Sequence, residues 1–235
     1  MRGDPRVDAG AELCTIFCMN HALILTRTAD HVRKLLSGDS AGHDWWHIER
    51  VRRVALTIAR EERADLFLVE LAALLHDVAD WKFAGGDEKA GPAAARQWLE
   101  SLDVDQPTTD HVCLVIAQLS FKGAGVATPM DSLEGACVQD ADRLEALGAI
   151  GIARAFAYGG WKGQAMHDPE LPPQPHGSFE QYKQNKGTSI NHFYEKLLLL
   201  KDRMNTAAGK RLAQARHEFM EQYLQRFFAE WAGER

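Results

Sequence analysis

The chain has 235 residues, of which 46% are hydrophobic and 26% are charged, and its formal net charge is −6. This apolar content excludes a disordered chain and allows a substantial core in one domain or two small ones. No block of Lys or Arg stands out, so binding of duplex nucleic acid is disfavoured as the main activity. A local cationic pocket for one small phosphate ligand remains compatible with this charge.

The cysteines do not form the pattern of a disulfide framework. They are Cys14, Cys18, Cys113 and Cys137. None of them forms a C-x-x-C pair, so we expect reduced thiols in a cytoplasmic protein. No apolar run reaches the roughly 18–20 residues of a membrane-spanning helix, so no membrane partner is expected.

Residues 1–28 are expected to form an N-terminal extension, partly disordered, before a main domain over residues 29–232. Three acidic residues, Asp4, Asp8 and Glu12, precede the short apolar patch of this extension. Their charge argues against a signal peptide. Met19 is an alternative start of the chain.

Hydrophobic residues recur with helical spacing through most of the main domain. Val51, Val54, Ala55 and Ile58 follow an i, i+3, i+4, i+7 pattern. The same pattern recurs in residues 68–75, 112–119 and 220–227 and, less regularly, in 193–204. Each predicts an amphipathic helix with one buried face. Because sustained alternation typical of strands is absent, the sequence predicts an all-α fold.

Residues 159–187 interrupt the helical pattern. This segment contains several glycines together with Pro169, Pro172, Pro173 and Pro175. Helices rarely tolerate so many breakers, so the segment is expected to be a long loop. It is either a surface loop or a lid over a site, and its aromatic residues favour partial packing over full disorder.

A pair of polar residues ends the apolar run Leu71–Phe83, LAALLHDVADWKF, where His76 and Asp77 stand side by side. An unsatisfied buried polar group costs roughly 1–3 kcal/mol, so internal hydrogen bonds or a metal ion must compensate. Adjacent residues on a helix point about 100° apart, but at a helix end they can converge on one ion. His47 and Asp142 would then join them from neighbouring helices of a bundle.

Two imidazoles and two carboxylates make a mixed set of nitrogen and oxygen ligands, which suits divalent ions from Mn²⁺ to Zn²⁺. Such a set leaves coordination positions for water and for a phosphate oxygen, and the ion would lower the pKa of water and polarise a P–O bond. The alternative is that each histidine is an ordinary core residue with hydrogen-bond partners. The adjacency of His76 and Asp77 favours the metal.

The order H … HD … D resembles that of the HD-domain superfamily of metal-dependent phosphohydrolases. Four blocks carry the resemblance: GHDWWHIERV, LAALLHDVADWKF, VQDADRLEALGAIGIARAFAYGG and INHFYEKLLLLKDRMNT. Together they are similar to a bacterial branch that includes Mn²⁺-dependent nucleoside triphosphate pyrophosphohydrolases. The resemblance spans residues 29–230, which is nearly the whole chain.

This resemblance implies an all-α, single-domain helical bundle of the HD type. It places the metal ligands at His47, His76, Asp77 and Asp142. Some relatives hold two or three ions through extra histidines between the HD pair and the last Asp. Only His111 lies in that interval, so one ion is expected. Mn²⁺ is the expected ion, with Mg²⁺, Co²⁺, Ni²⁺, Fe²⁺ and Zn²⁺ as alternatives.

Three residues beside the expected ligands are candidates for catalysis. Asp80 shares a helix face with His76 and Asp77, so it could orient or deprotonate the attacking water. It resembles the acid that follows the HD pair in guanosine-tetraphosphate hydrolases of the superfamily, and the alternative is an ion pair with Lys82. Lys82 and Arg143 are candidates to stabilise charge on the leaving pyrophosphate.

Further polar residues are candidates to bind the substrate. They are Arg50, His43, Lys122, Lys186, His192 and Lys196. The alternatives are solvated lysines, pairing of Arg50 with Glu49 or Asp44, and a capping role for His43 with Asp44. Tyr194 is a further candidate to line the pocket, and Tyr158 and Trp161 are candidates to stack on a base.

The favoured function is hydrolysis of a nucleoside triphosphate to the monophosphate and pyrophosphate, with water activated at the metal. A nucleotide monophosphatase or phosphodiesterase with the same metal site is the alternative. A non-catalytic nucleotide-binding protein is a further alternative, against which the complete ligand set argues. The expected partner is a nucleotide, and a homodimer is left open.

Overall fold

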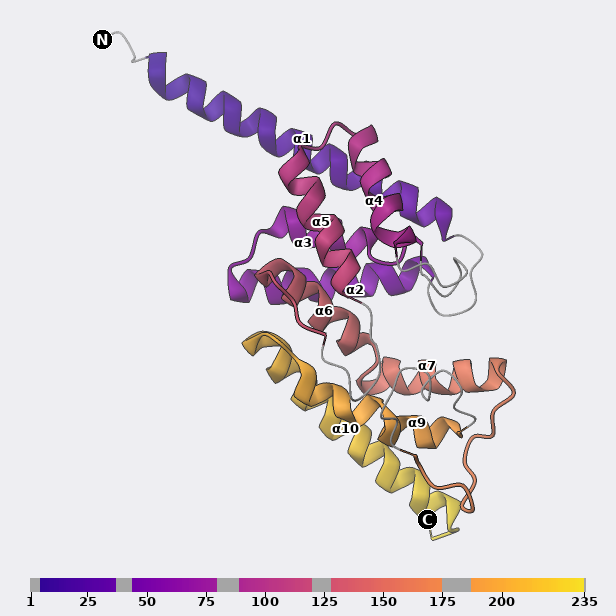
Figure 1. The fold of residues 1–235 in the computed structure, drawn as a ribbon. Coiled ribbons are helices and arrows are strands. Elements are labelled where there is room, and N and C mark those ends of the chain that lie inside the picture. Colours follow the sequence, from indigo (N-terminus) through magenta and orange to yellow (C-terminus); the bar gives the residue numbers. More distant parts are fainter. Residues whose placement is uncertain (1–4, 37–43, 80–88, 120–127, 175–186, 235) are drawn as a thin grey trace.

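The structure is a computed structural model that describes residues 5–36, 44–79, 89–119, 128–174 and 187–234. Within these ranges every regular element is a helix and no strand occurs (Figure 1). The prediction of an all-α fold is therefore confirmed. None of the helices in the described part of the chain is long and apolar enough to cross a membrane.

Three central helices pack closely against one another and contain the region of the expected site. They are α2 (Trp45–Glu62), α3 (Leu66–Leu75) and α6 (Leu133–Glu145). The sequence of α3, LFLVELAALL, is apolar on almost every side, as is typical of a helix with neighbours all round. In α2 the predicted stripe is confirmed, since Val51, Ala55 and Ile58 have no exposed surface.

Capping residues fix where these central helices begin. Asp44, Asp65 and Ser132 precede α2, α3 and α6, and each accepts a hydrogen bond from a backbone N–H of the first turn. Only three residues separate α2 from α3, and Arg63 makes the turn with a left-handed φ of 61°. Because this hairpin is antiparallel, the start of α2 lies beside the end of α3.

Three further helices lie on the other side of α3 (Figure 1). They are α1 (Pro5–Leu35), α4 (Ala90–Ser101) and α5 (Gln106–Gln118). The expected boundary between residues 28 and 29 falls inside α1, which continues across it without a break. The division into an extension and a main domain stays a prediction.

The C-terminal part of the chain packs below α6 in the view of Figure 1. It consists of α7 (Gly148–Trp161), α9 (Ser189–Glu195), the 3₁₀ helix η1 (Leu197–Arg203) and α10 (Ala207–Trp231). Aromatic rings fill the space between these helices. Phe156 lies 6.0 Å from Phe193 and 6.2 Å from Tyr223, measured between ring centroids.

The prediction of one amphipathic α-helix across residues 193–204 is wrong in its form. The α-helix α9 ends at Glu195, and Lys196 leaves helical geometry with φ −142° and ψ −59°. The 3₁₀ helix η1 follows, and its three residues per turn place Leu197 and Leu200 on one buried face. The apolar positions are thus buried as predicted, but residues 197–203 form a 3₁₀ helix instead of continuing the α-helix.

The described part of the segment 159–187 is attached to α9. The backbone N–H groups of Ser189 and Ile190 donate to the carbonyls of Ala165 and Met166, each at 3.0 Å. The side chain of Asn191, which is 1% exposed, donates to the carbonyl of Leu171 at 2.8 Å. Residues 165–171 therefore form a loop that is fixed to the bundle. Residues 175–186 of this segment lie outside the described residues, and a lid formed by residues 159–187 stays a prediction.

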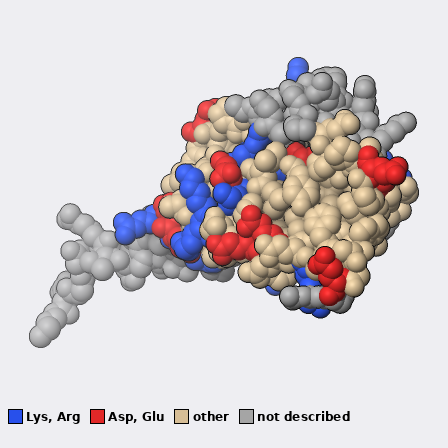
Figure 2. Space-filling view, turned by 90° about the horizontal axis from the view of Figure 1, so that it is seen from below, with Lys and Arg blue, Asp and Glu red and all other residues tan. Residues whose placement is uncertain are grey.

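Charged side chains of both signs are mixed on the molecular surface seen in Figure 2. Lys and Arg residues lie among Asp and Glu residues on this face rather than in one broad basic area. This mixture agrees with the net charge of −6. The expectation that duplex nucleic acid is not the main ligand stays a prediction.

A buried carboxylate joins α6 to the start of α10. Asp140 has no exposed surface and accepts hydrogen bonds of 2.8 Å from the backbone N–H groups of Asn205 and Thr206. The hydroxyl of Thr206 also donates to Asp140 at 2.8 Å. Gly209 leaves room for this contact, because a Cβ there would lie 2.2 Å from Oδ2 of Asp140.

We expect Gly209→Ala to lower the free energy of unfolding by about 3 kcal/mol, the upper end of the range for an overpacked site. The added methyl group must displace Asp140 and so weaken its hydrogen bonds. Gly160→Ala is the control, because a Cβ there meets no atom within 4 Å and a helical alanine gains up to about 1 kcal/mol. Urea denaturation measures both, and equal stabilities would contradict the packing described.

Candidate metal centre

The start of α2 places His47 inside the bundle. The side chain of Asp44 accepts a hydrogen bond of 2.9 Å from the backbone N–H of His47 and thereby caps the helix. His47 is 1% exposed. The cap thus fixes the backbone from which this imidazole projects.

The end of α3 presents two polar side chains to the same region. His76 is the C-cap of α3, and Asp77 follows as the chain leaves the helix. Nδ1 of His76 lies 2.9 Å from the carbonyl oxygen of Ala73. A carbonyl only accepts, so Nδ1 carries the proton and Nε2 holds the lone pair.

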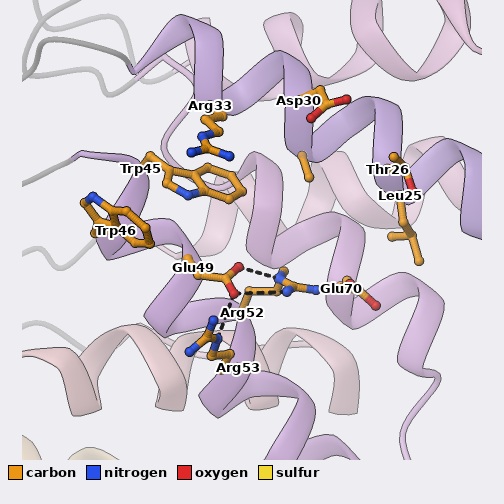
Figure 3. A pocket seen from close by; sticks show the side chains of 11 residues that line it. Leu25, Thr26, Asp30, Arg33, Trp45, Trp46, Glu49, Arg52, Arg53 and Glu70 are labelled. Atoms are coloured by element: carbon orange, nitrogen blue, oxygen red, sulfur yellow. Dashed lines mark hydrogen bonds and ion pairs between the residues drawn. The ribbon is translucent and has the colours of Figure 1, made fainter.

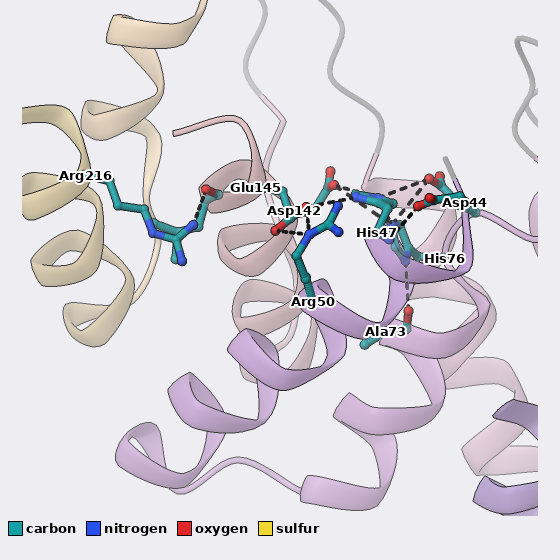
Figure 4. Close-up of polar contacts among 10 residues, drawn as sticks. Asp44, His47, Arg50, Ala73, His76, Asp142, Glu145 and Arg216 are labelled. Atoms are coloured by element: carbon teal, nitrogen blue, oxygen red, sulfur yellow. Dashed lines mark hydrogen bonds and ion pairs between the residues drawn. The ribbon is translucent and has the colours of Figure 1, made fainter. Parts of the chain in front are cut away.

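The side chains of His47, His76, Asp77 and Asp142 converge from α2, α3 and α6 (Figure 4 labels three of these residues). The two Nε2 atoms are 3.3 Å apart. Nε2 of His47 lies 3.4 Å from Oδ2 of Asp77 and 3.6 Å from Oδ1 of Asp142. The corresponding distances from Nε2 of His76 are 3.6 Å and 3.9 Å. The structure therefore brings together all four residues that the sequence singled out.

This donor set fits a divalent ion. Two ligand atoms at about 2.0–2.2 Å from a common ion are separated by about 3.0–3.5 Å when their bonds to it form an angle of 90–110°. The distance of 3.3 Å between the imidazole nitrogens agrees with this geometry. Two imidazole lone pairs at this distance repel each other, and a cation or a proton between them removes the repulsion. His47, His76 and Asp142 can therefore hold a metal ion.

The charges around His47 favour its protonated form when no ion is bound. Burial opposes that charge, but hydrogen bonds with Asp77 and Glu145 and the nearby carboxylate charges outweigh burial and raise the pKa of His47 to about 9. Burial likewise opposes the charge of Glu145, yet His47 and Arg50 lower the pKa of this carboxyl. A site that attracts a proton so strongly in the absence of metal is suited to a cation.

Arg50 is directed to a partner that the sequence did not suggest. Its Nε donates to Oε2 and Oε1 of Glu145 at 2.9 Å and 3.2 Å, rather than to Glu49 or Asp44 (Figure 4). Glu145 also lies 3.5 Å from Nδ1 of His47. Sequence reasoning missed Glu145. The available signal was its position one helical turn after Asp142, which matches the position of Arg50 one turn after His47.

Arg143 has two partners away from the candidate ligands. Its guanidinium donates to the carbonyl of Arg203 and to the hydroxyl of Thr128, the latter at 2.6 Å. Burial lowers the pKa of this guanidinium. These bonds join α6 to the chain before α6 and to the end of η1. The catalytic role of Arg143 stays a prediction.

The other predicted substrate-binding residues of the described chain lie on α9 or at its end. His192 and Lys196 are half-buried, and the backbone N–H of Lys196 donates to the carbonyl of His192 at 3.1 Å. Tyr194 is 40% exposed. Their roles stay predictions. The remaining predicted residues lie outside the described residues: His43, Asp80, Lys82, Lys122 and Lys186.

Two aromatic residues expected to stack on a base lie at the end of α7. Tyr158 and Trp161 are 52% and 63% exposed. Nζ of Lys162 lies 5.8 Å and 4.6 Å from the centres of their rings. Stacking on a base stays a prediction. His111, the histidine between the HD pair and Asp142, lies 3.6 Å from Glu134 and is half-buried.

A cavity of about 400 Å³ lies on the face of α2 turned toward α1 (Figure 3). Trp45, Trp46 and Glu49 contribute to its wall, and none of the four candidate ligands does. Arg33, Arg52 and Arg53 also line it; Arg33 lies 5.9 Å from the centre of the Trp45 ring, and Arg52 and Arg53 bind Glu49 at 2.8 Å and 2.7 Å. The cavity is therefore separate from the candidate metal centre.

Comparison with known proteins identifies the family of the fold. The sequence model of the HD domain matches residues 45–147, which contain all four candidate ligands. The uncharacterized protein YpgQ of Bacillus subtilis is 39% identical over 194 residues, which cover 82% of this chain and 86% of YpgQ. The chain belongs to the HD-domain family.

Solved structures of HD-domain relatives have the same fold over most of the chain. A protein from Lactobacillus plantarum is 39% identical, covers 89% of this chain and 97% of its own, and gives a TM-score of 0.78. An HD-superfamily hydrolase from Bacillus thuringiensis is 44% identical, with coverage of 90% and 98% and a TM-score of 0.72. YpgQ in complex with ADP superimposes with 33% identity, coverage of 90% and 96% and a TM-score of 0.71. These relatives support a metal-dependent phosphohydrolase in general terms.

Binding of a divalent ion at pH 7.5 is expected to release about one proton, because His47 holds a proton there and must lose it to become a ligand. Without metal, protonation of His47 stabilises the fold fully below its ordinary pKa of 6.5, and this contribution is lost as the pH rises through 9. Metal binding should accordingly strengthen with rising pH over this interval.

Calorimetric titration of Mn²⁺ in two buffers with different ionisation enthalpies measures the released protons. His111→Gln is the control, since this histidine pairs with Glu134 outside the cluster and should not alter the number. A binding enthalpy that is the same in both buffers would contradict the expectation.

Proposed function

We propose that the chain hydrolyses nucleoside triphosphates to the monophosphate and pyrophosphate with one divalent metal ion. The convergence of two imidazoles and two carboxylates supports this proposal. The two Nε2 atoms are 3.3 Å apart, and each lies 3.4–3.9 Å from an oxygen of Asp77 and of Asp142. Such a set binds a divalent ion and leaves positions open for other ligands. Membership of the HD-domain family supports the same reaction class.

His47, His76, Asp77 and Asp142 hold the ion in this proposal, and Mn²⁺ is the expected metal. When bound, an ion of this kind lowers the pKa of a water molecule and polarises the P–O bond. The side chains of the two histidines are 2% and 3% exposed, whereas that of Asp142 is 39% exposed. The imidazoles therefore form the closed side of the site, and substrate approaches from the side of Asp142.

A triphosphate requires positive charge beyond that of one divalent ion. Arg50 is the described cation that contacts the residues of the candidate site, through Glu145, and its side chain is 35% exposed. It is therefore assigned to bind phosphate. Lys82, Lys122 and Lys186 are further candidates for the same task, and Asp80 is the candidate to orient the attacking water.

The relative YpgQ supports a nucleotide as the substrate, because its structure was solved in complex with ADP. ADP contains the α/β phosphoanhydride bridge at which the proposed reaction takes place. The same four ligands would also serve a nucleotide monophosphatase or a phosphodiesterase. The bond that is cleaved must therefore be determined from the products.

A panel of ribo- and deoxyribonucleoside triphosphates with Mn²⁺ tests the proposal. Monophosphate and pyrophosphate are expected, detected by ³¹P NMR. Asp77→Asn should lower kcat/KM roughly a hundredfold or more, because several kcal/mol of transition-state stabilisation by the ion would be lost. Glu49→Gln is the control, since Glu49 is an acid on the opposite face of α2 that pairs with Arg52 and Arg53.

Two outcomes would replace this proposal. Release of orthophosphate from monophosphates, or opening of cyclic nucleotides in an extended panel, would assign the alternative bond. Nucleotide binding without any product would leave a binding protein.

A further inference from the structure

The carboxylate of Glu145 contacts two groups of the candidate site at once. It is 3% exposed, and its Oε2 lies 3.5 Å from Nδ1 of His47. Its two oxygens also accept hydrogen bonds from Nε of Arg50 at 2.9 Å and 3.2 Å (Figure 4). One buried carboxylate thus contacts both a candidate metal ligand and the cation assigned to phosphate.

The register of two helices produces this arrangement. His47 and Arg50 are three residues apart on α2, and Asp142 and Glu145 are three residues apart on α6. Residues with this spacing share a helix face. Because α2 and α6 pack directly together, the two pairs face each other, with Asp142 near Nε2 of His47 and Glu145 near its Nδ1.

We propose that Glu145 is a positioning residue that sets the tautomer and orientation of His47 and directs the guanidinium of Arg50 toward the substrate phosphate. The part that concerns Arg50 rests on the proposed function. The part that concerns His47 rests on metal binding alone and is tested without any nucleotide.

The physical reason for the first part is the position of Oε2 of Glu145, 3.5 Å from Nδ1 of His47, where a small approach makes a hydrogen bond. A carboxylate accepts a hydrogen bond from Nδ1–H, so the lone pair of the imidazole is on Nε2, the atom that faces His76 and Asp142. Hydrogen bonding to a carboxylate also makes the imidazole a stronger ligand. His76 achieves the same tautomer through the carbonyl of Ala73.

The second part follows from the geometry of arginine. Both carboxylate oxygens of Glu145 accept hydrogen bonds from Nε of Arg50. A guanidinium has two further nitrogens in the same plane, which are able to bind a phosphate while Nε is occupied. A fixed guanidinium loses less freedom on binding than a mobile one, so Glu145 strengthens the interaction without contacting the substrate.

A third helix, α10, contacts α6 beside Glu145. Arg216 of α10 donates to the carbonyl of Leu144, and its side-chain carbons would lie 3.2 Å from a Cβ at Gly148. Gly148 has a φ of 73°, which glycine adopts without strain, and no Cβ obstructs the arginine there. The charge of Arg216 acts on Glu145. His47, Arg50 and Arg216 thus all favour the ionised carboxylate.

Glu145→Gln tests the proposal, because a glutamine offers one acceptor oxygen and turns an NH₂ group toward one of the two donors. The Kd for Mn²⁺, measured by titration calorimetry on the full chain, should rise about 10–100-fold. Arg50→Met should leave the Kd for Mn²⁺ close to the wild-type value. Both variants should weaken binding of ADP in the presence of saturating Mn²⁺ by about tenfold or more.

Glu49→Gln is the matched control for Glu145→Gln. Glu49 is also a buried acid that binds arginines, yet it lies on the opposite face of α2. This control should lose no affinity for Mn²⁺. Wild-type affinity in Glu145→Gln, or the same loss in Glu49→Gln, would overturn the proposal, as would a wild-type chain that binds no Mn²⁺.

A second variant and one combination of results complete the test. If Glu145→Gln does not fold, Glu145→Asp takes its place: a carboxylate withdrawn by one methylene should bind Mn²⁺ less tightly, and unchanged affinity overturns the proposal. If the metal result is as expected while the wild-type chain hydrolyses no nucleotide, the proposed function fails and the assignment of Glu145 to His47 stands.

Discussion

Two imidazole nitrogens that face each other at 3.3 Å impose the main constraint on this fold. Two facing lone pairs would repel, so a proton on His47 or a metal ion must lie between the rings. The cap at Asp44 fixes the start of α2, and the carbonyl of Ala73 fixes the ring at the end of α3. The antiparallel hairpin of α2 and α3 then brings these two ends together.

The central hairpin is stabilised by the apolar helix α3, which has helices packed around it. α3 is covered by α1 and α5 on one side and by α2 and α6 on the other. At one end of this hairpin His47 and His76 meet with their side chains buried. A close-packed interior resists rearrangement, so it holds the two imidazoles at this distance whether a proton or a cation lies between them.

Much of this arrangement could be predicted from the sequence. Helical spacing gave the buried faces of α2, α3 and α5, and the adjacent His76 and Asp77 marked the end of α3 as polar. His47 and Asp142 were proposed to join this pair from neighbouring helices, and the resemblance to HD-domain proteins supported that choice, because periodicity alone does not select them from the other polar residues. The geometry confirms that these side chains converge, whereas their identity as metal ligands is a proposal.

Other features depend on packing that the sequence does not reveal. Arg143 follows Asp142 directly, and a rotation of about 100° per residue turns its side chain toward Thr128 and Arg203 instead of toward the ligands. The position of Glu145 one turn after Asp142 is visible in the sequence, but its contacts with His47 and Arg50 depend on how α6 packs against α2. The change to a 3₁₀ helix after Glu195 was hidden, because leucines at Leu197 and Leu200 suit both helix types.

Two aspartates on α6, Asp140 and Asp142, serve different purposes although one residue separates them. Asp140 is enclosed and organises the first residues of α10, whereas Asp142 is the more open member of the histidine cluster. Loss of activity in a mutational scan would therefore have two origins along this single helix. The yield of folded protein distinguishes them: replacement of Asp140 should reduce it, and replacement of Asp142 should not.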